Sequence, residues 1–372
     1  MPTALKGLKV LDFSTLLPGP FASMYLADMG AEVIHVESPS RPDLVRIMPP
    51  YANGQATAHS YLNRNKQSIT LDLKDAANIE LIKNKISEFD ILLEQFRPDV
   101  MRRLGLDYET LAEINPRLIY CSITGYGQTG TYKDRAGHDI NYLALAGISG
   151  HSGRQDSGPP PFGVQIADVA GGSLHAVIGI LAAVVERQRS GMGQYIDISM
   201  TDCVASLNSM AASASLAGQT PQGPEQGMLN GAIFYDYYET KDGRYFSVGS
   251  LEPQFMTGLA AALDLPILMA KGSSFDPEDR QAIKQALKEK FRSKDFAEWQ
   301  SIFSQLDICV EPVLSLDEAL TSPIAKQRGW VVDVPLSENT DQTEPQLACP
   351  IKFSRSQMRY QFIGQGLGQG KW

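Results

Sequence analysis

The stretch from Lys9 to Glu37, KVLDFSTLLPGPFASMYLADMGAEVIHVE, decides the fold. It opens with a short β-type run, KVLDF, and closes with a second one, EVIHVE from Glu32 to Glu37. Between them, the turn-forming LLPGP precedes a helical pattern from Phe21 to Met29, which a glycine ends. A strand, a helix and a strand in this order are typical of a βαβ unit, in which the two strands lie parallel in one sheet.

The same alternation of β-type and helical segments continues as far as Ile198. The further β-type runs are Ser68 to Leu73, Asp90 to Glu94, Leu118 to Ile123 and Gln194 to Ile198. Together they predict an α/β fold with roughly six parallel strands in a doubly wound, Rossmann-like sheet. Ligands of such sheets bind beyond the carboxyl ends of the strands, so we expect the functional residues there.

The second half of the chain has a different pattern. Residues 218–231 are rich in Gln, Pro, Gly and Asn, which is typical of a linker. A β-hairpin follows from Phe234 to Val248, because Asp242-Gly243 supplies a tight turn between two β-type runs. Two or three helices between Pro253 and Leu306 and a strand from Cys309 to Leu314 complete a small α+β domain.

These patterns predict three parts. A large α/β domain takes residues 1–220, and the smaller α+β domain takes residues 221–325. Residues 326–372, which are rich in Pro, Gln and Gly, form an irregular C-terminal segment that returns to the large domain or to a partner subunit. A chain of 372 residues exceeds the size of a single core, which agrees with more than one domain.

Composition narrows the classes of function. A net charge of −9 argues against a nucleic-acid surface and a polybasic membrane anchor, so an anionic ligand must meet a local basic patch. The four cysteines form no CxxC pair, and the first residues lack a secretion signal, so we expect reduced thiols and a cytoplasmic location. The apolar run from Val177 to Val185 is about half of a membrane span, and we expect a buried helix there.

The segment from Gln165 to Gln188 contains the first candidate for chemistry. Asp168 stands at the start of a long helical pattern, where a carboxylate caps free N–H groups and meets the helix dipole. A plain structural cap is the simplest interpretation. However, the small residues from Ala170 to Ser173 would let a ligand approach the backbone, and the N–H groups there could stabilise an oxyanion.

His138 and Glu252 are weaker candidates. His138 lies between the Gly-rich loop from Gly125 to Gly130 and an apolar helix, a place where function is common, although a lone histidine is more often structural. Glu252 precedes a proline at a strand-to-helix junction and, taken alone, is a capping carboxylate. Nothing in the spacing connects Glu252 to His138.

Two further signals concern anionic ligands. Lys66, Lys74, Arg97, Arg102 and Arg103 lie close to the early strands and could hold a phosphate, although most would be ordinary solvated charges. Glu37 ends the second strand, where a dinucleotide fold often keeps its ribose-binding acid. The preceding turn lacks G-x-G-x-x-G, so nicotinamide binding is disfavoured.

At these residues the sequence resembles the family III coenzyme A transferases, the carnitine dehydratase and bile-acid-inducible group, and within them the α-methylacyl-CoA racemases. The resemblance runs from Leu8 to about Leu314. Its marks are LLPGP, LDLK at Leu71 to Lys74, QFRPDVMRRLG at Gln95 to Gly105, NPRLIY at Asn115 to Tyr120, GYGQTG, GHDINY at Gly137 to Tyr142, ADVAGG at Ala167 to Gly172, EPQF at Glu252 to Phe255 and CVEPVL at Cys309 to Leu314.

The resemblance implies a fold and a ligand. The large domain would bind coenzyme A as part of the substrate, and two subunits would interlock as a homodimer. The residues that would line the coenzyme A site are Arg41, Leu71, Asp72, Leu73, Lys74, Arg97, Arg103, Gly137, Asp139, Ile140, Asn141 and Tyr142.

The resemblance also implies the chemistry, with two alternatives. In the racemases Asp168 and His138 would exchange protons at C2 of a 2-methylacyl-CoA through an enolate, and Glu252 would hydrogen-bond to His138. In the transferases Asp168 would attack a thioester and carry an anhydride and then a thioester intermediate. The presence of both His138 and Glu252 favours the racemase branch. No metal or redox cofactor is required, and the acyl group stays open.

Overall fold

In the computed structural model, which describes residues 2–274 and 276–372, the chain forms two compact units. The first unit holds the chain up to Ala146 together with Phe162–Leu207 and Pro323–Trp372. The second holds Gly147–Pro161 and Asn208–Ser322. The sequence placed the first boundary at residue 220 and did not indicate that residues 147–161 leave the large domain.

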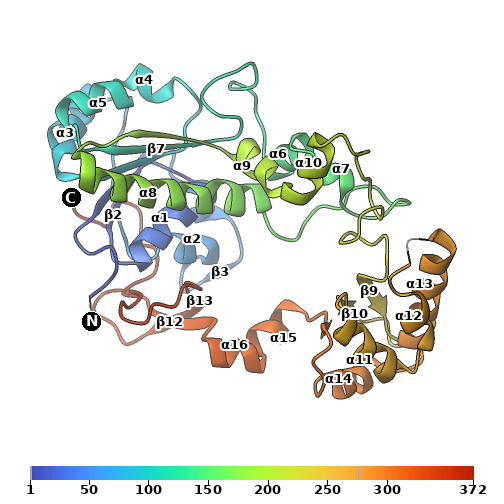
Figure 1. Cartoon of the computed structure of the whole chain (residues 1–372). Helices are drawn as coiled ribbons and strands as arrows, with labels where there is room; N and C mark the ends of the chain where they lie inside the picture. Colours follow the sequence, from blue (N-terminus) through green and yellow to red (C-terminus); the bar gives the residue numbers. More distant parts are fainter. Residues whose placement is uncertain (1, 275) are drawn as a thin grey trace. The chain divides into compact units, whose positions relative to one another are not determined.

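The first unit is built on a six-stranded sheet of order β5-β2-β1-β6-β7-β8 (Figure 1). Every pairing in this sheet is parallel. The strands are β1 (Lys9–Asp12), β2 (Glu32–Glu37), β5 (Lys66–Thr70), β6 (Ile91–Glu94), β7 (Ile119–Thr124) and β8 (Tyr195–Ser199). The predicted doubly wound α/β fold is therefore confirmed, with the strand order reversing between β1 and β6, where such sheets open a crevice for a ligand.

Helices cover both faces of this sheet (Figure 1). The helices are α1 (Pro18–Asp28) and α8 (His175–Ser190) on one face, and α3 (Ala76–Lys85), α4 (Val100–Leu104) and α5 (Tyr108–Ile114) on the other. The second face carries a continuous core in which Leu11 and Leu92 of the sheet pack with Ile82 of α3 and Leu111 of α5. Burial of both faces agrees with the apolar runs of β6 and β7, although buried polar residues such as Asp12, Glu37 and Lys66 also lie on the strands.

The segment Ala167–Ser190 forms one helical stretch of 24 residues, longer than the predicted apolar run. By length and composition alone it could cross a membrane, a test that core helices also meet. Here Ala176, Ile180 and Ala183 are buried, and the helix packs on β7 and β8. One face of the helix is therefore buried, whereas Ile178 and Val185 are exposed, so the buried helix predicted for residues 177–185 is only partly confirmed.

Short elements complete the first unit. They are η1 (Leu44–Ile47), β3 (Tyr51–Ala52), β4 (Gln55–Ala56), α2 (Thr57–Leu62), η2 (Ile86–Glu88), α6 (Asp139–Leu145), η3 (Ala167–Leu174), α9 (Met200–Leu207), α16 (Pro323–Arg328), β12 (Val331–Pro335) and β13 (Thr343–Leu347). β12 and β13 form an antiparallel hairpin, which the prediction of an irregular C-terminal segment missed.

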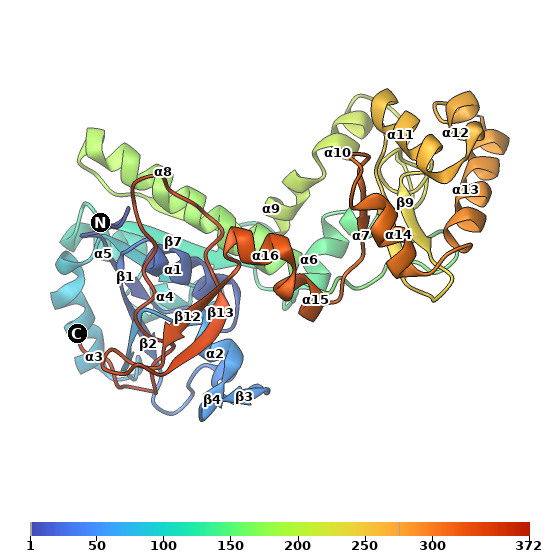
Figure 2. The same ribbon diagram turned by 90° about the horizontal axis from the view of Figure 1, so that it is seen from below.

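The C-terminal segment covers the edge of the sheet at β5 (Figure 2). The N–H of Gly370 donates to the carbonyl of Ser68 at 2.6 Å, and the N–H of Asn65 donates to the carbonyl of Phe362 at 3.0 Å. The side-chain oxygen of Gln365 accepts from the N–H of Ser68 at 3.1 Å. Because an open edge strand is a template for unwanted pairing, this cover satisfies β5 within the same chain.

The second unit contains a three-stranded antiparallel sheet of order β11-β10-β9. Its elements are α7 (Ile148–His151), α10 (Ser209–Leu216), β9 (Asp236–Glu239), β10 (Tyr245–Val248), α11 (Pro253–Leu263), α12 (Pro266–Lys271), α13 (Pro277–Phe291), α14 (Phe296–Phe303), β11 (Val310–Pro312) and α15 (Leu316–Thr321). The predicted hairpin is confirmed, and Gly243 at its turn has φ +78°. Four helices, rather than two or three, lie between β10 and β11.

An ion network explains why residues 147–161 belong to the second unit. Arg154 pairs with Asp236 at 2.6 Å and with Glu225 at 3.0 Å. Lys284 of α13 also reaches Asp236, at 3.0 Å. These partners are more than sixty residues from Arg154 in the sequence, so a pattern of local residues could not have predicted the association.

A fully buried ion pair holds the C-terminal segment on the first unit. Arg64 binds both carboxylate oxygens of Asp28, at 2.9 and 2.6 Å, and donates to the carbonyl of Leu347 at 2.7 Å. Asn65 joins Asp28 to the carbonyl of Arg359. The Asp28 carboxylate therefore fixes Arg64 and Asn65, and these two residues hold the C-terminal segment at Leu347 and Arg359.

We expect Asp28→Ala to lower the free energy of unfolding by about 3–5 kcal/mol, because it leaves the Arg64 guanidinium buried without its counter-ion. The measurement is urea denaturation. As a control, Glu80→Ala removes the exposed Glu80–Lys83 pair and should change the free energy by about 0.5 kcal/mol or less. Equal effects of the two substitutions would contradict this account of the C-terminal segment.

Candidate active site

A cavity of about 390 Å³ lies at the carboxyl edge of the sheet in the first unit. Its walls come from the segment after β6, from the end of β7 and the residue after it, and from the start of α9 after β8. The loop before α6 and α6 itself complete the walls. The lining residues are Gln95, Phe96, Arg97, Pro98, Ile123, Thr124, Gly125, Lys133, Arg135, Ala136, Gly137, His138, Asn141, Tyr142 and Met200. Of the predicted site residues it therefore brings together Arg97, Gly137, His138, Asn141 and Tyr142.

Side-chain hydrogen bonds fix the first turn of α6, which begins after His138. The side-chain oxygen of Asn141 accepts from the N–H of His138 at 3.0 Å, and the hydroxyl of Tyr142 donates to the carbonyl of Gly137 at 2.6 Å. A Cβ at Gly137 would lie 2.7 Å from the Tyr142 ring, and one at Gly125 would lie 2.5 Å from it. Both positions require glycine because the Tyr142 ring lies against their backbones.

Asp168 lies in the first turn of η3, a π-helical segment that continues into α8. The N–H groups of Ala167 and Asp168 both donate to Oδ1 of Asp139, at 2.6 and 3.0 Å. Asp139 is the first residue of α6, directly after His138. One carboxylate therefore joins the start of the Asp168 helix to the start of the His138 helix.

The environment of Asp168 alters its ionisation. Burial raises the pKa of Asp168, the negative charge of Asp139 raises it further, and the charge of His138 opposes them, so that the pKa reaches about 6. Burial, followed by the charge of Asp168, also raises the pKa of Tyr142, to about 12. A perturbed carboxyl beside a histidine at the ligand edge of the sheet is typical of an acid–base site.

The small residues after Asp168 serve packing, which differs from the prediction that they admit a ligand. A Cβ at Gly171 would lie 2.9 Å from Val204, and one at Gly172 would lie 3.1 Å from both Met200 and Pro18. Both glycines are buried where α1 and α9 pack against η3. Close helix packing is the reason for the small side chains.

Three N–H groups at the start of η3 already have acceptors, whereas the role of the N–H groups from Ala170 to Ser173 as oxyanion donors stays a prediction. Asp139 accepts from the N–H groups of Ala167 and Asp168, and the carbonyl of Gln165 accepts from the N–H of Val169 at 2.9 Å. Since these three donors already have partners, they are not free to hold an enolate oxygen.

Three basic side chains lie on the cavity, those of Arg97, Lys133 and Arg135. Lys133 pairs with Asp99 at 2.8 Å, and the Arg135 guanidinium lies 4.1 Å from the Tyr132 ring centre. The sequence predicted Arg97 but missed Lys133 and Arg135. Two basic residues just before the GHD motif of an acidic chain were the signal that could have found them.

Two other candidate ligand residues, Lys66 and Glu37, are already bonded to other groups of the protein. Lys66 is 1% exposed, lies 3.6 Å from Asp12 and donates to the carbonyl of Pro20, so it cannot hold a phosphate. Glu37 is buried and bonded to Arg46 and to the N–H of Asp43, so it is not a free ribose ligand.

The remaining predicted residues, among them Asp168, Asp139 and Ile140, do not line this cavity. Arg41 and Leu71–Lys74 follow β2 and β5, and Arg103 lies on α4. Glu252 belongs to the second unit, where it precedes α11 and is exposed. Its pairing with His138 stays a prediction.

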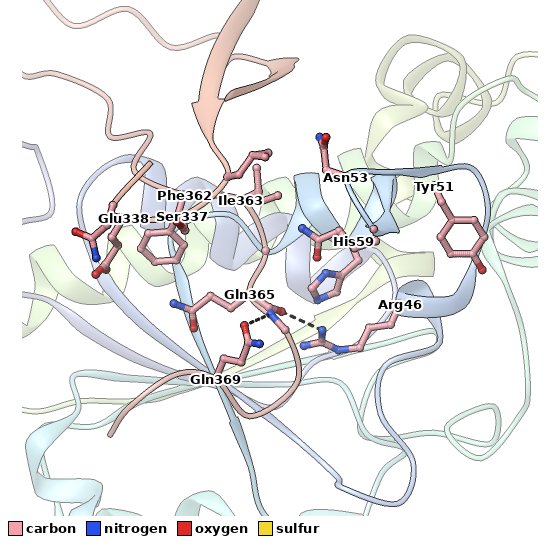
Figure 3. A pocket seen from close by; sticks show the side chains of 16 residues that line it. Arg46, Tyr51, Asn53, His59, Ser337, Glu338, Phe362, Ile363, Gln365 and Gln369 are labelled. Atoms are coloured by element: carbon pink, nitrogen blue, oxygen red, sulfur yellow. Dashed lines mark hydrogen bonds between the residues drawn. The ribbon is translucent and has the colours of Figure 1, made fainter. Parts of the chain in front are cut away.

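A larger cavity, of about 590 Å³, lies between η1, α2 and the C-terminal segment (Figure 3). Its guanidinium, on Arg46, is already bound to Glu37, Ser68 and the carbonyl of Gln365. Burial and the charge of Arg46 lower the pKa of His59 to about 3, so that ring is neutral. This cavity contains none of the predicted site residues.

Within residues 2–274 and 276–372, no group of three His, Cys, Asp or Glu side chains is arranged to hold a metal ion. The ionisable side chains at the carboxyl edge include a histidine, carboxylates and basic residues.

The doubly wound parallel sheet, with a cavity at its carboxyl edge, defines the α/β class of the large unit. The chain belongs to CoA-transferase family III, whose model matches residues 5–368. The predicted family resemblance is therefore confirmed, and the enzyme lies in the acyl-CoA racemase and CoA-transferase group of that family.

Individual relatives include both activities. The chain is 40% identical over 329 residues to the alpha-methylacyl-CoA racemase of Mus musculus, covering 87% of this chain and 81% of that protein. It is 33% identical over 336 residues to the succinyl-CoA:glutarate CoA-transferase of Homo sapiens, covering 89% and 76%. The crystal structure of a CAIB/BAIF family protein from Brucella suis matches with a TM-score of 0.86 at 31% identity, over 99% of this chain and 97% of that one.

We expect the Asp168 carboxyl to titrate at about pH 6, so that it is neutral below and ionised above that value. The measurement is ¹³C NMR of protein labelled at the aspartate side-chain carboxyl, and Asp168→Asn identifies the resonance by its loss. A transition near the ordinary aspartate value of 3.8 would show that burial and Asp139 do not act on this group as the structure indicates.

Proposed function

We propose that this protein is a racemase or epimerase that acts at C2 of 2-methylacyl-CoA thioesters. The observation that carries the proposal is the placement of Asp168, with its raised pKa, in electrostatic contact with His138 at the carboxyl edge of the sheet. The identity of 40% to an alpha-methylacyl-CoA racemase supports the same reaction.

The proposed reaction moves a proton between the two faces of one carbon. One member of the pair removes the C2 proton, which the thioester carbonyl acidifies, and leaves an enolate. The other member returns a proton to the opposite face, so the configuration at C2 is inverted. The reactive enzyme carries one proton on the Asp168–His138 pair, because one group must act as a base while the other acts as an acid.

Asp168 suits the role of a reversible base. A carboxylate with a pKa of about 6 holds a proton more tightly than an ordinary aspartate, and yet is ionised at neutral pH. In the proposal Glu252 hydrogen-bonds to His138 and fixes its tautomer. The reaction requires neither a metal nor a redox cofactor.

We further propose that the coenzyme A moiety binds along the carboxyl edge of the sheet. Arg97, Lys133 and Arg135 give the cavity the local positive charge that phosphates need on an acidic chain. The other proposed contacts are Arg41, Leu71, Asp72, Leu73, Lys74, Arg103, Gly137, Asp139, Ile140, Asn141 and Tyr142. The proposed assembly is an interlocked homodimer, and the proposed location is the cytoplasm.

A CoA-transferase is the second candidate. The 33% identity to a succinyl-CoA:glutarate CoA-transferase favours it. In that reaction Asp168 attacks the thioester carbonyl, coenzyme A leaves as a thiolate, and the acyl group remains on Asp168 as an anhydride. That sequence needs the Asp168 carboxylate but assigns no proton transfer to His138.

Deuterium incorporation separates the two candidates. In deuterated water without an acceptor acid, the wild-type enzyme should replace the C2 proton of a 2-methylacyl-CoA by deuterium. Mass spectrometry measures this incorporation. His138→Gln and Asp168→Asn should each lower the exchange rate by about 10²–10⁴-fold, the usual contribution of a general acid or base.

The transferase gives the opposite pattern in the same assay. It would show no exchange, would pass coenzyme A to added glutarate, and would leave an acyl group on Asp168 that hydroxylamine releases. Retained exchange in His138→Gln would remove that residue from the proposed pair.

Arg135→Ala tests the proposed phosphate contact. We expect the KM for the acyl-CoA to rise about tenfold, as for the loss of one hydrogen bond to a charged group. The KM for the matching acyl-pantetheine, which lacks the adenosine phosphates, should not change. Arg189→Ala, at the exposed end of α8, is the control and should change neither value. An equal rise for both substrates would contradict a phosphate contact.

A further inference from the structure

Asp139 occupies an unusual position between the two groups of the proposed pair. It follows His138 directly, and its side chain accepts the N–H groups of Ala167 and Asp168 from a segment 28 and 29 residues further along the chain. The start of α6 and the start of η3 therefore meet at one carboxylate oxygen. A small movement of Asp139 would displace Asp168 relative to His138.

The negative charge of Asp139 is not needed for these hydrogen bonds. A neutral side-chain amide oxygen caps helix N–H groups about as well as a carboxylate. In the described part of the chain, Asp139 takes part in no ion pair within 4.0 Å, whereas Asp28, Glu37 and Asp236 each have a basic partner. No nearby basic side chain therefore neutralises the charge of Asp139, and this charge acts on Asp168.

We propose that Asp139 is a positioning residue for the proposed proton transfer: its two hydrogen bonds hold Asp168 beside His138, and its uncompensated charge acts on the Asp168 carboxylate. This inference rests on the proposed function and assigns Asp139 a role beyond a contact with coenzyme A. Asp139 acts through Asp168 and does not exchange a proton with the substrate.

The electrostatic part of the proposal agrees with the ionisation of Asp168. After burial, the charge of Asp139 is the main cause that raises the pKa of Asp168, and His138 acts in the opposite direction. The elements packed against η3 carry further titratable groups: Tyr142 on α6, Tyr25 and Asp28 on α1, His175, Glu186, Arg187 and Arg189 on α8, Tyr195 and Asp197 on β8, and Asp202 and Cys203 on α9. None of these groups is a cause of the Asp168 shift.

Two substitutions separate the hydrogen bonds from the charge. Asp139→Asn keeps an acceptor oxygen and removes the charge, so the pKa of Asp168 should fall and the acidic limb of kcat/KM should move to lower pH by about one unit. Its kcat near neutral pH should stay within about tenfold of wild type. Asp139→Ala removes both functions, and its kcat should fall by about 10²-fold as Asp168 is displaced, with little change in KM.

Controls distinguish positioning from folding and from coenzyme A binding. Asp134→Asn removes an exposed acid of the same loop and should leave the pH profile, kcat and KM unchanged. Thermal unfolding checks that each variant is folded; if Asp139→Ala does not fold, Asp139→Asn alone decides. An unchanged acidic limb in Asp139→Asn, or a rise in KM with kcat preserved in both variants, would overturn the proposal.

The ¹³C titration of Asp168 gives a readout that does not depend on the reaction. If the wild-type enzyme transfers coenzyme A and exchanges no deuterium, the proposed racemase fails, but Asp139→Asn must still lower the titration midpoint of Asp168. If the midpoint stays at about 6 in this variant, the role of Asp139 fails even where racemisation is found.

Discussion

All strands of the β5-β2-β1-β6-β7-β8 sheet run in the same direction, and the candidate site depends on this constraint. In a parallel sheet every strand ends at the same edge, so segments far apart in the sequence meet there. Arg97 follows β6, Gly125 follows β7 and Met200 follows β8, and all three line one cavity. His138 before α6 also lines this cavity, and Asp168 of η3 is held to the start of α6 through Asp139.

Much of this architecture could be predicted from the sequence, because its signals are local. Short β-type runs separated by helical patterns and turn residues mark the strands, and each of the six predicted runs corresponds to a strand of the sheet. The prediction for β5 was displaced by about two residues towards its C-terminus: the strand ends at Thr70, and Leu71 only continues its hydrogen bonding to Glu37. Arg154 shows the limit of local signals, since its ion pairs to Glu225 and Asp236 carry residues 147–161 into the second unit.

The candidate site was less predictable, because residue type does not reveal the partner. The glycines after Asp168 were expected to admit a ligand, but their space is filled by Val204, Met200 and Pro18 from neighbouring helices. Lys66 was a candidate for phosphate, yet it is buried against Asp12. The sequence shows where small or charged residues stand. Only the tertiary structure shows whether such a residue packs against a helix, pairs with a counter-ion or is free to bind a ligand.

The choice between racemisation and transfer depends on His138, the residue before Asp139. A half-buried carboxylate such as Asp168 can attack a thioester carbon or remove a proton from its neighbour, so its own environment fits either reaction. Only racemisation needs a second group that exchanges a proton on the opposite face of the same carbon. His138 lines the cavity, and the hydrogen bonds of Asp139 hold its helix to that of Asp168. A fixed spacing between Asp168 and His138 is what the proposed racemisation needs, because it uses both groups in one turnover, whereas the alternative transfer needs only the position of Asp168.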